Sequence, residues 1–368
     1  MQEMIETIRR RLLAWFRRTQ RDLPWRQTYD PYHVWISEIM LQQTQMERGV
    51  AYFHRWISRF PDLAAVAAAS EQEILKCWEG LGYYARARNL HRAARLLRDR
   101  YGGQIPCDYR TLQSLPGVGP YTAAAIASIA CGQDVPVVDA NVARILARLY
   151  DLEEPVKSAG CRQRIEALAA ALLPPGKARA FNQALMDLGG LVCTPKNPDC
   201  HHCPLAEACL ARLRGTVADR PVPARRRETV LIEMATAILS NEGRVFIQQR
   251  LADDIWGSLW EFPGGRLEDG ETPEEAVIRE YREETGFEVE ICGRITTVTH
   301  FYTRYKVVLH CFACRLVGSD TVARLEAARD CRWVSAGQLS EYGFPAGHRK
   351  LLEYLAVARP EFLVDPCR

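Results

Sequence analysis

Four cysteines gathered within 17 residues constrain this chain more than any other feature. They are Cys193, Cys200, Cys203 and Cys209, in the stretch CTPKNPDCHHCPLAEAC, separated by six, two and five residues. Four thiolates this close in sequence can close around one centre, either a zinc ion or an iron–sulfur cluster. Three prolines in the same stretch favour a wrapping loop over a helix. The spacing therefore predicts a metal-binding loop over 193–209.

The chain changes its pattern shortly after that loop. At 368 residues it exceeds the usual size of one domain. Residues 1–214 favour helices and contain no convincing strand pattern, whereas residues 229–368 contain runs such as RVFIQQR and YKVVLHCFACRL, interrupted by helical segments. Residues 215–228 hold two prolines, a glycine and a run of arginines, which are typical of a linker. We therefore predict an all-α domain over 1–214, a linker, and an α/β domain over 229–368.

The spacing of apolar residues predicts that the first domain begins with an amphipathic helix whose apolar residues face inward. Those residues are Ile5, Ile8, Leu12, Leu13 and Phe16. Further helices are expected over 32–47, 71–79, 85–100, 120–131, 141–149, 160–172 and 178–191. In the second domain, helices are expected over 273–285 and near 346–357.

Charge and cysteine usage narrow the class of partner. Residues 1–227 carry a net charge of +10 and residues 228–368 a net charge of −7. A basic domain beside an acidic one suggests that the first meets a polyanion, although solvated helix faces would give the same numbers.

Thirteen cysteines without a secretion signal indicate a reducing compartment. No apolar run approaches the roughly 18 residues that span a bilayer, so we expect a cytoplasmic monomer without membrane partners.

A glycine-rich turn opens one of the expected helices. In LPGVGPYTAAAIASIA, residues 115–130, Gly117 and Gly119 permit close backbone approach. Amide groups at the start of the following helix can then bind a phosphate without reading base sequence. A plain corner between two helices would look similar, so the motif alone is moderately specific.

Two carboxylates in the first domain are candidates for acid chemistry. Glu38 lies in the apolar segment VWISEIMLQQTQ, where burial would raise its pKa and let it act as an acid near neutral pH. Asp139 follows the turn in VPVVDANVARI. An aspartate immediately before a helix is also a common N-cap, and this reading stays open.

A third carboxylate group lies in GGRLEDGETPEEAVIREYREETGF, residues 264–287. Glu280, Glu283 and Glu284 would share one face of a helix, where they could hold a divalent cation against a diphosphate. Thr272 with Glu275 forms a capping box, with Pro273 in the first turn and Gly286 as the expected C-terminal stop. The alternative is a charged surface helix on a domain that only binds.

The cysteine spacing, the LPGVGPYTA turn, the aspartate after it and SEIMLQQTQ together resemble the helix-hairpin-helix DNA glycosylases. Within these, the match is to the MutY-type adenine DNA glycosylases. LPWR (23–26), GLGYYARARNL (80–90) and FNQALMDLG (181–189) fit the same family in the same order. The resemblance covers residues from about 5 to 212, with the helix-hairpin-helix at about 110–131, and its combined motifs are highly specific.

This resemblance implies a two-lobed all-α glycosylase with a [4Fe–4S] cluster on the four cysteines. Such an enzyme removes adenine mispaired with 8-oxoguanine or guanine in double-stranded DNA. By position, Glu38 would protonate the adenine ring, and Asp139 would stabilise the oxocarbenium-like sugar or attack it. The implied assisting and pocket residues are Asn141, Tyr121, Arg26 and Gln183.

The same resemblance implies a set of DNA contacts. Swinging the base out leaves a gap in the duplex that a side chain must fill. The candidates for filling the gap or contacting the strands are Gln42, Gln43, Thr44, Tyr83, Gly117 and Gly119; Tyr83 could instead be an ordinary packing aromatic. Lyase-type relatives carry a lysine where this chain has Tyr121, and a tyrosine cannot form a Schiff base. We therefore predict a monofunctional glycosylase.

Residues 229–368 resemble a Nudix domain, which MutY-type enzymes carry to recognise 8-oxoguanine. The hydrolase box is complete here except at Tyr281, where an aliphatic residue is usual. It implies Mg²⁺ or Mn²⁺ on Glu280, Glu283 and Glu284, and possible hydrolysis of 8-oxo-dGTP. Two segments resemble lesion-reading parts of the family domain, HFYTR with Tyr302 and Thr303, and FPAGHRK with His348. HFYTR departs from the usual His-x-Phe-Ser-His.

Three readings follow from these motifs. The first is an adenine glycosylase with a recognition domain, and the second is a fused enzyme that also hydrolyses oxidised nucleotides. The third is a non-enzymatic iron–sulfur protein that binds DNA. The presence of both Glu38 and Asp139 argues against the third.

Overall fold

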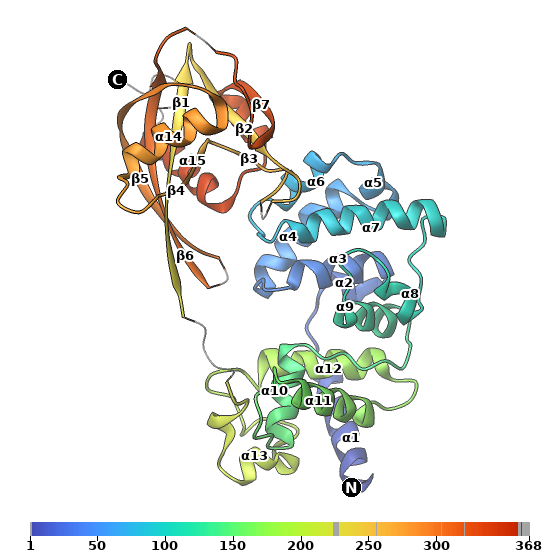
Figure 1. Ribbon diagram of the computed structural model, residues 1–368. Helices are drawn as coiled ribbons and strands as arrows, with labels where there is room; N and C mark the ends of the chain where they lie inside the picture. Colours follow the sequence, from blue (N-terminus) through green and yellow to red (C-terminus); the bar gives the residue numbers. More distant parts are fainter. Residues whose placement is uncertain are drawn as a thin grey trace. The chain divides into compact units, whose positions relative to one another are not determined.

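The computed structural model describes residues 2–223, 228–254, 256–302, 304–319, 321–359 and 362. Contacts divide the chain into two compact units (Figure 1). The first comprises Met1–Ala68 and Asn89–Arg226, and the second comprises Ala69–Arg88 and Arg227–Arg368. In the described part of the chain, no helix is both long and apolar enough to cross a bilayer.

The first unit is built from helices, as expected for residues 1–214. Those lying wholly within it are α1 (Gln2–Thr19), α2 (Pro24–Thr28), α3 (Pro31–Leu41), α4 (Met46–Arg59), α5 (Leu63–Ala68), α8 (Tyr109–Gln113), α9 (Pro120–Ala125), the π-helix η1 (Ile126–Ala130), α10 (Ala140–Leu149), α11 (Ala159–Leu172), α12 (Ala178–Leu191), the 3₁₀ turns η2 (Ala206–Ala208) and η3 (Val217–Asp219), and α13 (Leu210–Leu213). Helix α7 (Ala85–Tyr101) starts in the second unit and continues into the first.

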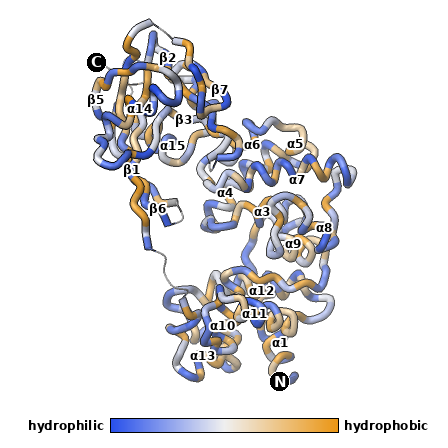
Figure 2. Tube along the Cα trace, viewed as in Figure 1, coloured by the Kyte–Doolittle hydropathy of each residue, from blue (hydrophilic) through white to orange (hydrophobic). Residues whose placement is uncertain are grey.

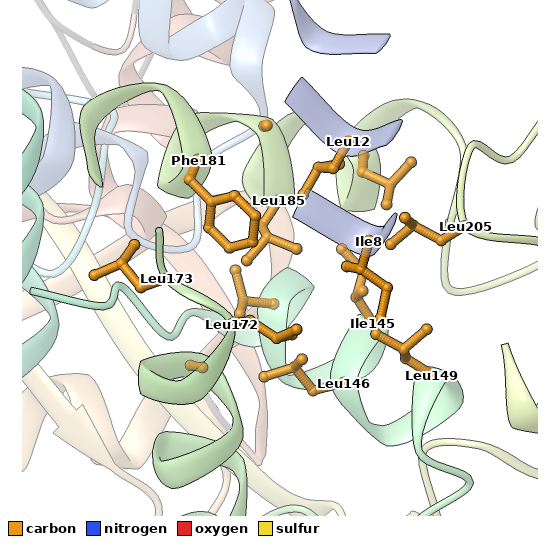
Figure 3. Close-up of a cluster of buried hydrophobic side chains, with 14 of the residues drawn as sticks. Ile8, Leu12, Ile145, Leu146, Leu149, Leu172, Leu173, Phe181, Leu185 and Leu205 are labelled. Atoms are coloured by element: carbon orange, nitrogen blue, oxygen red, sulfur yellow. The ribbon is translucent and has the colours of Figure 1, made fainter. Parts of the chain in front are cut away.

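One core of the first unit joins α1 to α10, α11 and α12 (Figure 3). Ile8 and Leu12 of α1 pack with Ile145, Leu172 and Phe181, all almost fully buried. The inward face predicted for the N-terminal helix is confirmed, with Ile5 and Leu13 at its partly buried edge. Burial of an aliphatic side chain of this size contributes about 1.5–3 kcal/mol to the free energy of unfolding. Helix α1 therefore stabilises the unit by packing on α10, α11 and α12.

The single helix expected over 32–47 is wrong. Helix α3 ends at Leu41, and α4 begins at Met46. The backbone between them leaves the helical region at Gln42 (ψ 110°) and turns left-handed at Gln43 (φ +59°). Residues 42–45 therefore form a turn between two helices and not the last turn of one.

The second unit contains a seven-stranded sheet. Its strands are β1 (Val230–Asn241), β2 (Arg244–Arg250), β3 (Trp260–Glu261), β4 (Gly264–Arg266), β5 (Val289–Tyr302), β6 (Tyr305–Leu316) and β7 (Ala328–Ser335). The main order is β3-β2-β1-β6-β5, with β4 paired to β1 and β7 to β2. The β1–β6 pair is parallel and the other pairs are antiparallel. Strand β1 is mostly hydrophobic in Figure 2, and its residues 235–240 are buried, as expected for a central strand covered on both faces.

A helix covers each face of the sheet (Figure 1). Helix α14 (Pro273–Thr285) packs Ala276, Val277 and Tyr281 on one face, and α15 (Ala346–Ala358) packs Leu351 and Leu355 on the other. A 3₁₀ helix, η4 (Ala336–Glu341), precedes α15. The expected all-α part followed by an α/β part is confirmed.

Residues 69–88 belong to the second unit although they lie in the helical part of the sequence. They contain α6 (Glu71–Trp78) and the loop after it. The Lys76 ammonium donates to the Tyr342 carbonyl (3.1 Å), and the Tyr84 hydroxyl donates to the Phe344 carbonyl (3.1 Å). The Phe344 amide in turn donates to the Glu79 carboxylate (3.2 Å). Residues 342–344 therefore anchor the GLGYY loop within this unit.

Candidate active site

The glycine-rich turn lies between α8 and α9. Gly117 has φ +74°, and a Cβ there would lie 2.5 Å from the Asn89 Cβ, so only glycine fits. Gly119 is the N-cap of α9 and has open space where a Cβ would be. The helix expected over 120–131 is α-helical to Ala125 and then a π-helix. A disulfide that the sequence did not indicate joins Cys107 to Cys131, on either side of this element.

Glu38 is a buried acid, as its apolar neighbours predict. It lies in α3, is 4% exposed, and accepts a 2.5 Å hydrogen bond from the Tyr121 hydroxyl. Burial raises its pKa to about 7; the Tyr121 hydrogen bond opposes this rise, and the charge of Asp139 adds to it. Near neutral pH, Glu38 is thus divided between its acid form and its anion.

Glu38 borders a cavity in the first unit together with Arg26 and Gln183. Its volume is about 20 Å³, close to the space that one water molecule needs. The other lining residues are mostly apolar: Arg21, Leu23, Trp25, Val34, Leu41, Met46, Ile129 and Met186. The geometry brings three of the predicted pocket residues together, and a nucleobase would have to widen this cavity to enter.

Asp187 fixes the position of Arg26, and sequence reasoning missed it. It is fully buried and forms ion pairs of 2.7 Å with Arg26 and 2.5 Å with Arg21. These two cations hold the pKa of the Asp187 carboxyl below its ordinary value in spite of burial. Asp187 lies one helical turn after Gln183 in FNQALMDLG, so that spacing was the available signal.

Asp139 is both an N-cap and part of the site. Its carboxylate accepts from the Val142 amide (2.7 Å), which caps α10, and from the Asn141 side-chain amide (2.8 Å). Burial raises its pKa, and these hydrogen bonds oppose that rise. Its charge acts on both Glu38 and Tyr121. The cap therefore fixes the Asp139 carboxyl where its charge acts on Glu38.

Neighbouring residues lock this arrangement. The side-chain carbonyl of Asn141 accepts a hydrogen bond from the Arg144 guanidinium (2.8 Å). Gly189 packs against Asn141, since a Cβ at Gly189 would lie 2.5 Å from the Asn141 Cβ. Asn182, 1% exposed, accepts from the Val137 amide (3.1 Å) and donates to the Val135 carbonyl (2.8 Å). The segment that leads to Asp139 is thus held by α12, a role that the sequence did not reveal.

The four cysteines of the 193–209 loop line one small cavity, and none is in a disulfide. Arg148 donates to the Cys193 sulfur (3.4 Å), and the Cys209 thiol donates to the Arg148 carbonyl (3.4 Å). Burial raises the pKa of the Cys203 thiol to about 11, with the other three cysteines adding to the rise. Four cysteines that line one cavity beside a guanidinium are residue types that suit a metal centre with anionic thiolate ligands.

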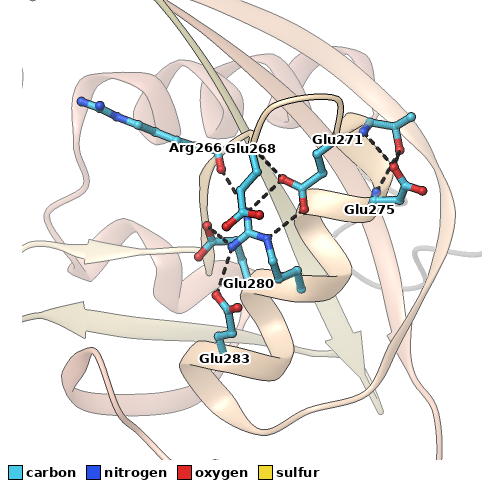
Figure 4. Close-up of polar contacts among 8 residues, drawn as sticks. Arg266, Glu268, Glu271, Glu275, Glu280 and Glu283 are labelled. Carbon is cyan, nitrogen blue, oxygen red and sulfur yellow. Dashed lines mark hydrogen bonds and ion pairs between the residues drawn. The ribbon is translucent and has the colours of Figure 1, made fainter.

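In the second unit, the local signals for α14 are confirmed. The Thr272–Glu275 capping box is present, Pro273 opens the helix, and Gly286 ends it at φ +73°. Three acids of the box converge on Arg279 (Figure 4). Its guanidinium lies 2.8 Å from Glu271 and 3.0 Å from both Glu280 and Glu283. These ion pairs with Arg279 give the three acids a structural role besides the cation binding expected from their spacing.

Glu284 is held apart from that network. It accepts from the Gly264 amide (3.1 Å) and from the Gln248 side chain (2.9 Å), and burial raises its pKa to about 8. Glu280 and Glu284 both border a cavity of about 360 Å³. Its other lining residues are Ile232, Met234, Arg250, Asp254, Trp256, Gly264, Gly265, Arg266, Tyr305 and Val307. Acids at metal-binding spacing therefore face a space of ligand size.

Comparison with known proteins places both units. Residues 36–171 match the model of the HhH-GPD superfamily of base excision DNA repair proteins, and residues 234–354 match that of the NUDIX domain. The chain is 33% identical to an adenine DNA glycosylase of Rattus norvegicus over 89% of this chain and 74% of that protein. For an adenine DNA glycosylase of Homo sapiens the identity is 32% over 90% and 70%. This chain belongs to the adenine DNA glycosylase family.

Other comparisons agree with this family. A Mycolicibacterium smegmatis adenine DNA glycosylase is 42% identical over 57% of this chain and 72% of that protein. A thermostable thymine-DNA glycosylase structure covers 58% of this chain and 98% of its own, with TM-score 0.54 and 29% identity. An endonuclease III–DNA complex, 22% identical with TM-score 0.51, shows the same fold. As a member of the adenine DNA glycosylase family, the chain is a DNA glycosylase of base excision repair.

Several residues assigned to DNA contacts lie in turns or loops. The Gln42 side chain donates to Thr122 in α9 (3.3 Å), and Thr44 follows the left-handed Gln43. Tyr83 is left-handed (φ +49°), and the Arg86 guanidinium lies 5.5 Å from its ring centre. Of the lesion-reading candidates, Thr303 and the side chain of Tyr302 lie outside the described residues. His348 is buried in the second unit.

Proposed function

We propose that this chain hydrolyses the N-glycosidic bond of adenine paired with 8-oxoguanine or guanine in duplex DNA. The observation that supports it best is the pairing of a buried acid of raised pKa with a fixed carboxylate. Glu38 and Asp139 lie close enough for the charge of one to shift the pKa of the other. Such a pair can act as acid and anion, as paired carboxylates do in glycoside hydrolysis.

In this proposal the adenine leaves the stack and widens the cavity beside Glu38, next to Arg26 and Gln183. The neutral Glu38 donates its proton to the ring, so the base leaves as a neutral molecule. Asp139 stabilises the positive charge that develops on the sugar, or bonds to it until water completes the hydrolysis. Tyr121 has no amine and cannot form a Schiff base, so strand cleavage is not part of the reaction.

A duplex assay tests both parts of this proposal. With the full chain and an A·8-oxoguanine duplex, we expect free adenine and an abasic strand that breaks only on later alkali treatment. Borohydride should trap no covalent protein–DNA adduct. Nicking through a trapped adduct at the rate of base release would contradict the monofunctional mechanism, and no adenine release would contradict the function.

We also propose that Cys193, Cys200, Cys203 and Cys209 hold a [4Fe–4S] cluster. Support comes from the four cysteines that line one cavity and from Arg148, whose charge would offset that of the thiolates. Iron and sulfide analysis of purified protein tests this; one zinc ion per chain would contradict it. Recognition of 8-oxoguanine is proposed for the second unit, through Tyr302 and Thr303 with His348.

A second activity is favoured by the cavity beside the acidic helix. We propose that the second unit also cleaves 8-oxo-dGTP to its monophosphate with Mg²⁺ or Mn²⁺ on Glu280, Glu283 and Glu284. Carboxylates are the ligands that these ions prefer, and the bound ion would neutralise and polarise the diphosphate. Gly265 leaves room for this arrangement, since a Cβ there would lie 2.0 Å from a Glu280 carboxylate oxygen.

We expect Glu284→Gln to reduce Mg²⁺-dependent 8-oxo-dGTP cleavage by at least about 10²-fold, because a metal-facing charge is lost. The matched control is Glu274→Gln, on the same helix, exposed and outside the Arg279 network. Pyrophosphate release from 8-oxo-dGTP is measured with the full chain. Absence of wild-type turnover with either metal would leave the second unit as a binding domain only, and equal activity of the two variants would remove Glu284 from the site.

A further inference from the structure

Two histidines lie side by side in the second unit with unsatisfied ring nitrogens. His348, at the start of α15, is 8% exposed, and His300 of β5 is half-buried. Within the described residues, the Nδ1 atoms of both rings are buried without a hydrogen-bond partner. A buried polar atom without a partner costs about 1–3 kcal/mol. Two at one place indicate a ligand that the chain alone does not supply.

Both rings border a small cavity of about 30 Å³ that adjoins the larger cavity beside the acidic helix. The two cavities share the lining residues Met234, Arg250, Trp256, Gly264 and Val307. Glu280 and Glu284 therefore line the larger cavity, and the two histidines line the smaller cavity that adjoins it.

The two imidazoles are held in place by packing. The His348 ring lies 5.7 Å from the Phe262 ring. Gly347 lets His300 approach, since a Cβ there would lie 3.2 Å from the His300 Cε1. Burial lowers the pKa of His348 to about 3, and the charge of Arg250 adds to this effect. A neutral imidazole carries one donor and one acceptor, so it can pair with the edge of an uncharged ring.

We propose that His348 and His300 form the subsite that reads the base of a nucleotide bound in this cavity. The triphosphate would lie toward Glu280 and Glu284, and the base edge would meet the two imidazoles beside Trp256. This inference rests on the nucleotide-cleaving activity proposed above and names the residues that recognise its substrate. It adds the base of a free nucleotide as a partner of His348, beside the 8-oxoguanine in DNA proposed above.

Two other occupants would satisfy the same nitrogens. The smaller cavity has about the volume of one water molecule, which could bridge the rings. An 8-oxoguanine extruded from DNA is the second alternative. A nucleotide is favoured because the cavity of the histidines shares five lining residues with the cavity of the acids at diphosphate-binding spacing, and neither alternative requires this proximity.

Binding of the hydrolysis product tests the subsite without requiring turnover. Calorimetric titration of the full chain would use 8-oxo-dGMP, dCMP and deoxyribose 5-phosphate, which lacks a base. His348→Leu should weaken 8-oxo-dGMP binding about tenfold, the value of one hydrogen bond, and leave deoxyribose 5-phosphate unchanged. His348→Asn, which keeps a donor and an acceptor, should recover part of the loss. His310→Leu is the control, on β6 but absent from both cavity walls.

Thermal unfolding separates recognition from structure. Because the buried Nδ1 of His348 has no partner among the described residues, leucine should leave the melting temperature unchanged or raise it. The subsite would be overturned if His348→Leu weakened the binding of all three ligands equally. It would also be overturned if His348→Leu bound 8-oxo-dGMP as tightly as wild type. Reduced 8-oxoguanine-dependent adenine release with intact nucleotide binding would overturn it in favour of DNA reading. Nucleotide binding without hydrolysis would uphold the subsite and refute the cleavage activity. Hydrolysis that His348→Leu does not affect would uphold the cleavage activity and refute the subsite.

Discussion

Glu38→Gln should reduce the single-turnover rate of adenine release by about 10²–10⁴-fold, the usual contribution of a general acid. Glutamine keeps the shape of the side chain and can still accept from Tyr121, but it has no acidic proton. Duplex binding, measured separately by fluorescence anisotropy, should be retained. Glu166→Gln, an exposed change on α11, is the control and should behave as wild type.

The pH dependence of Glu38 gives a second readout. Its pKa is raised to about 7, so the acid form that donates the proton falls tenfold per pH unit above that value. The wild-type rate should decline accordingly, and the decline should be absent from the residual activity of Glu38→Gln. The raised pKa also means that its contribution to stability is present below pH 4.5 and lost as pH rises through about 7. The glutamine variant should therefore unfold no more easily than wild type at pH 8, and loss of fold would contradict the assignment.

Asp139→Asn should lower adenine release by about 10²–10³-fold, because it removes the negative charge that faces the developing sugar cation. Asparagine is as good an N-cap as aspartate, so α10 should keep its start and the protein its stability. The measurement is again the single-turnover rate on an A·8-oxoguanine duplex, with thermal unfolding run in parallel.

Asp108→Asn is a closely matched control for this change. Asp108 is the N-cap of α8 and accepts from the Thr111 amide (2.7 Å), but it is exposed and has no place in the site. If both asparagine variants release adenine at the wild-type rate, Asp139 is only a cap. If Asp139→Asn loses activity together with its fold, the electrostatic role is unsupported.

Several parts of the fold followed from local pattern. The inward face of α1 and the start and stop of α14 depend on residues within a few positions of one another, so their physics is contained in the sequence. The error over 32–47 is of another kind. Residues 42–45, QQTQ, contain no glycine or proline to mark a helix end, but the backbone leaves the helix at Gln42 and turns left-handed at Gln43.

The sequence by itself determined the chemical groups. These are a glutamate in an apolar segment, an aspartate at the start of a helix, four clustered cysteines and an acidic helix. Only the tertiary structure decided which groups meet. It placed the Glu38 carboxylate on the Tyr121 hydroxyl and paired Arg26 with Asp187. It also brought His300 and His348 to one small cavity, next to the larger cavity that Glu280 lines. The physical reason is that burial and electrostatic contact act through space, between residues that are far apart along the chain.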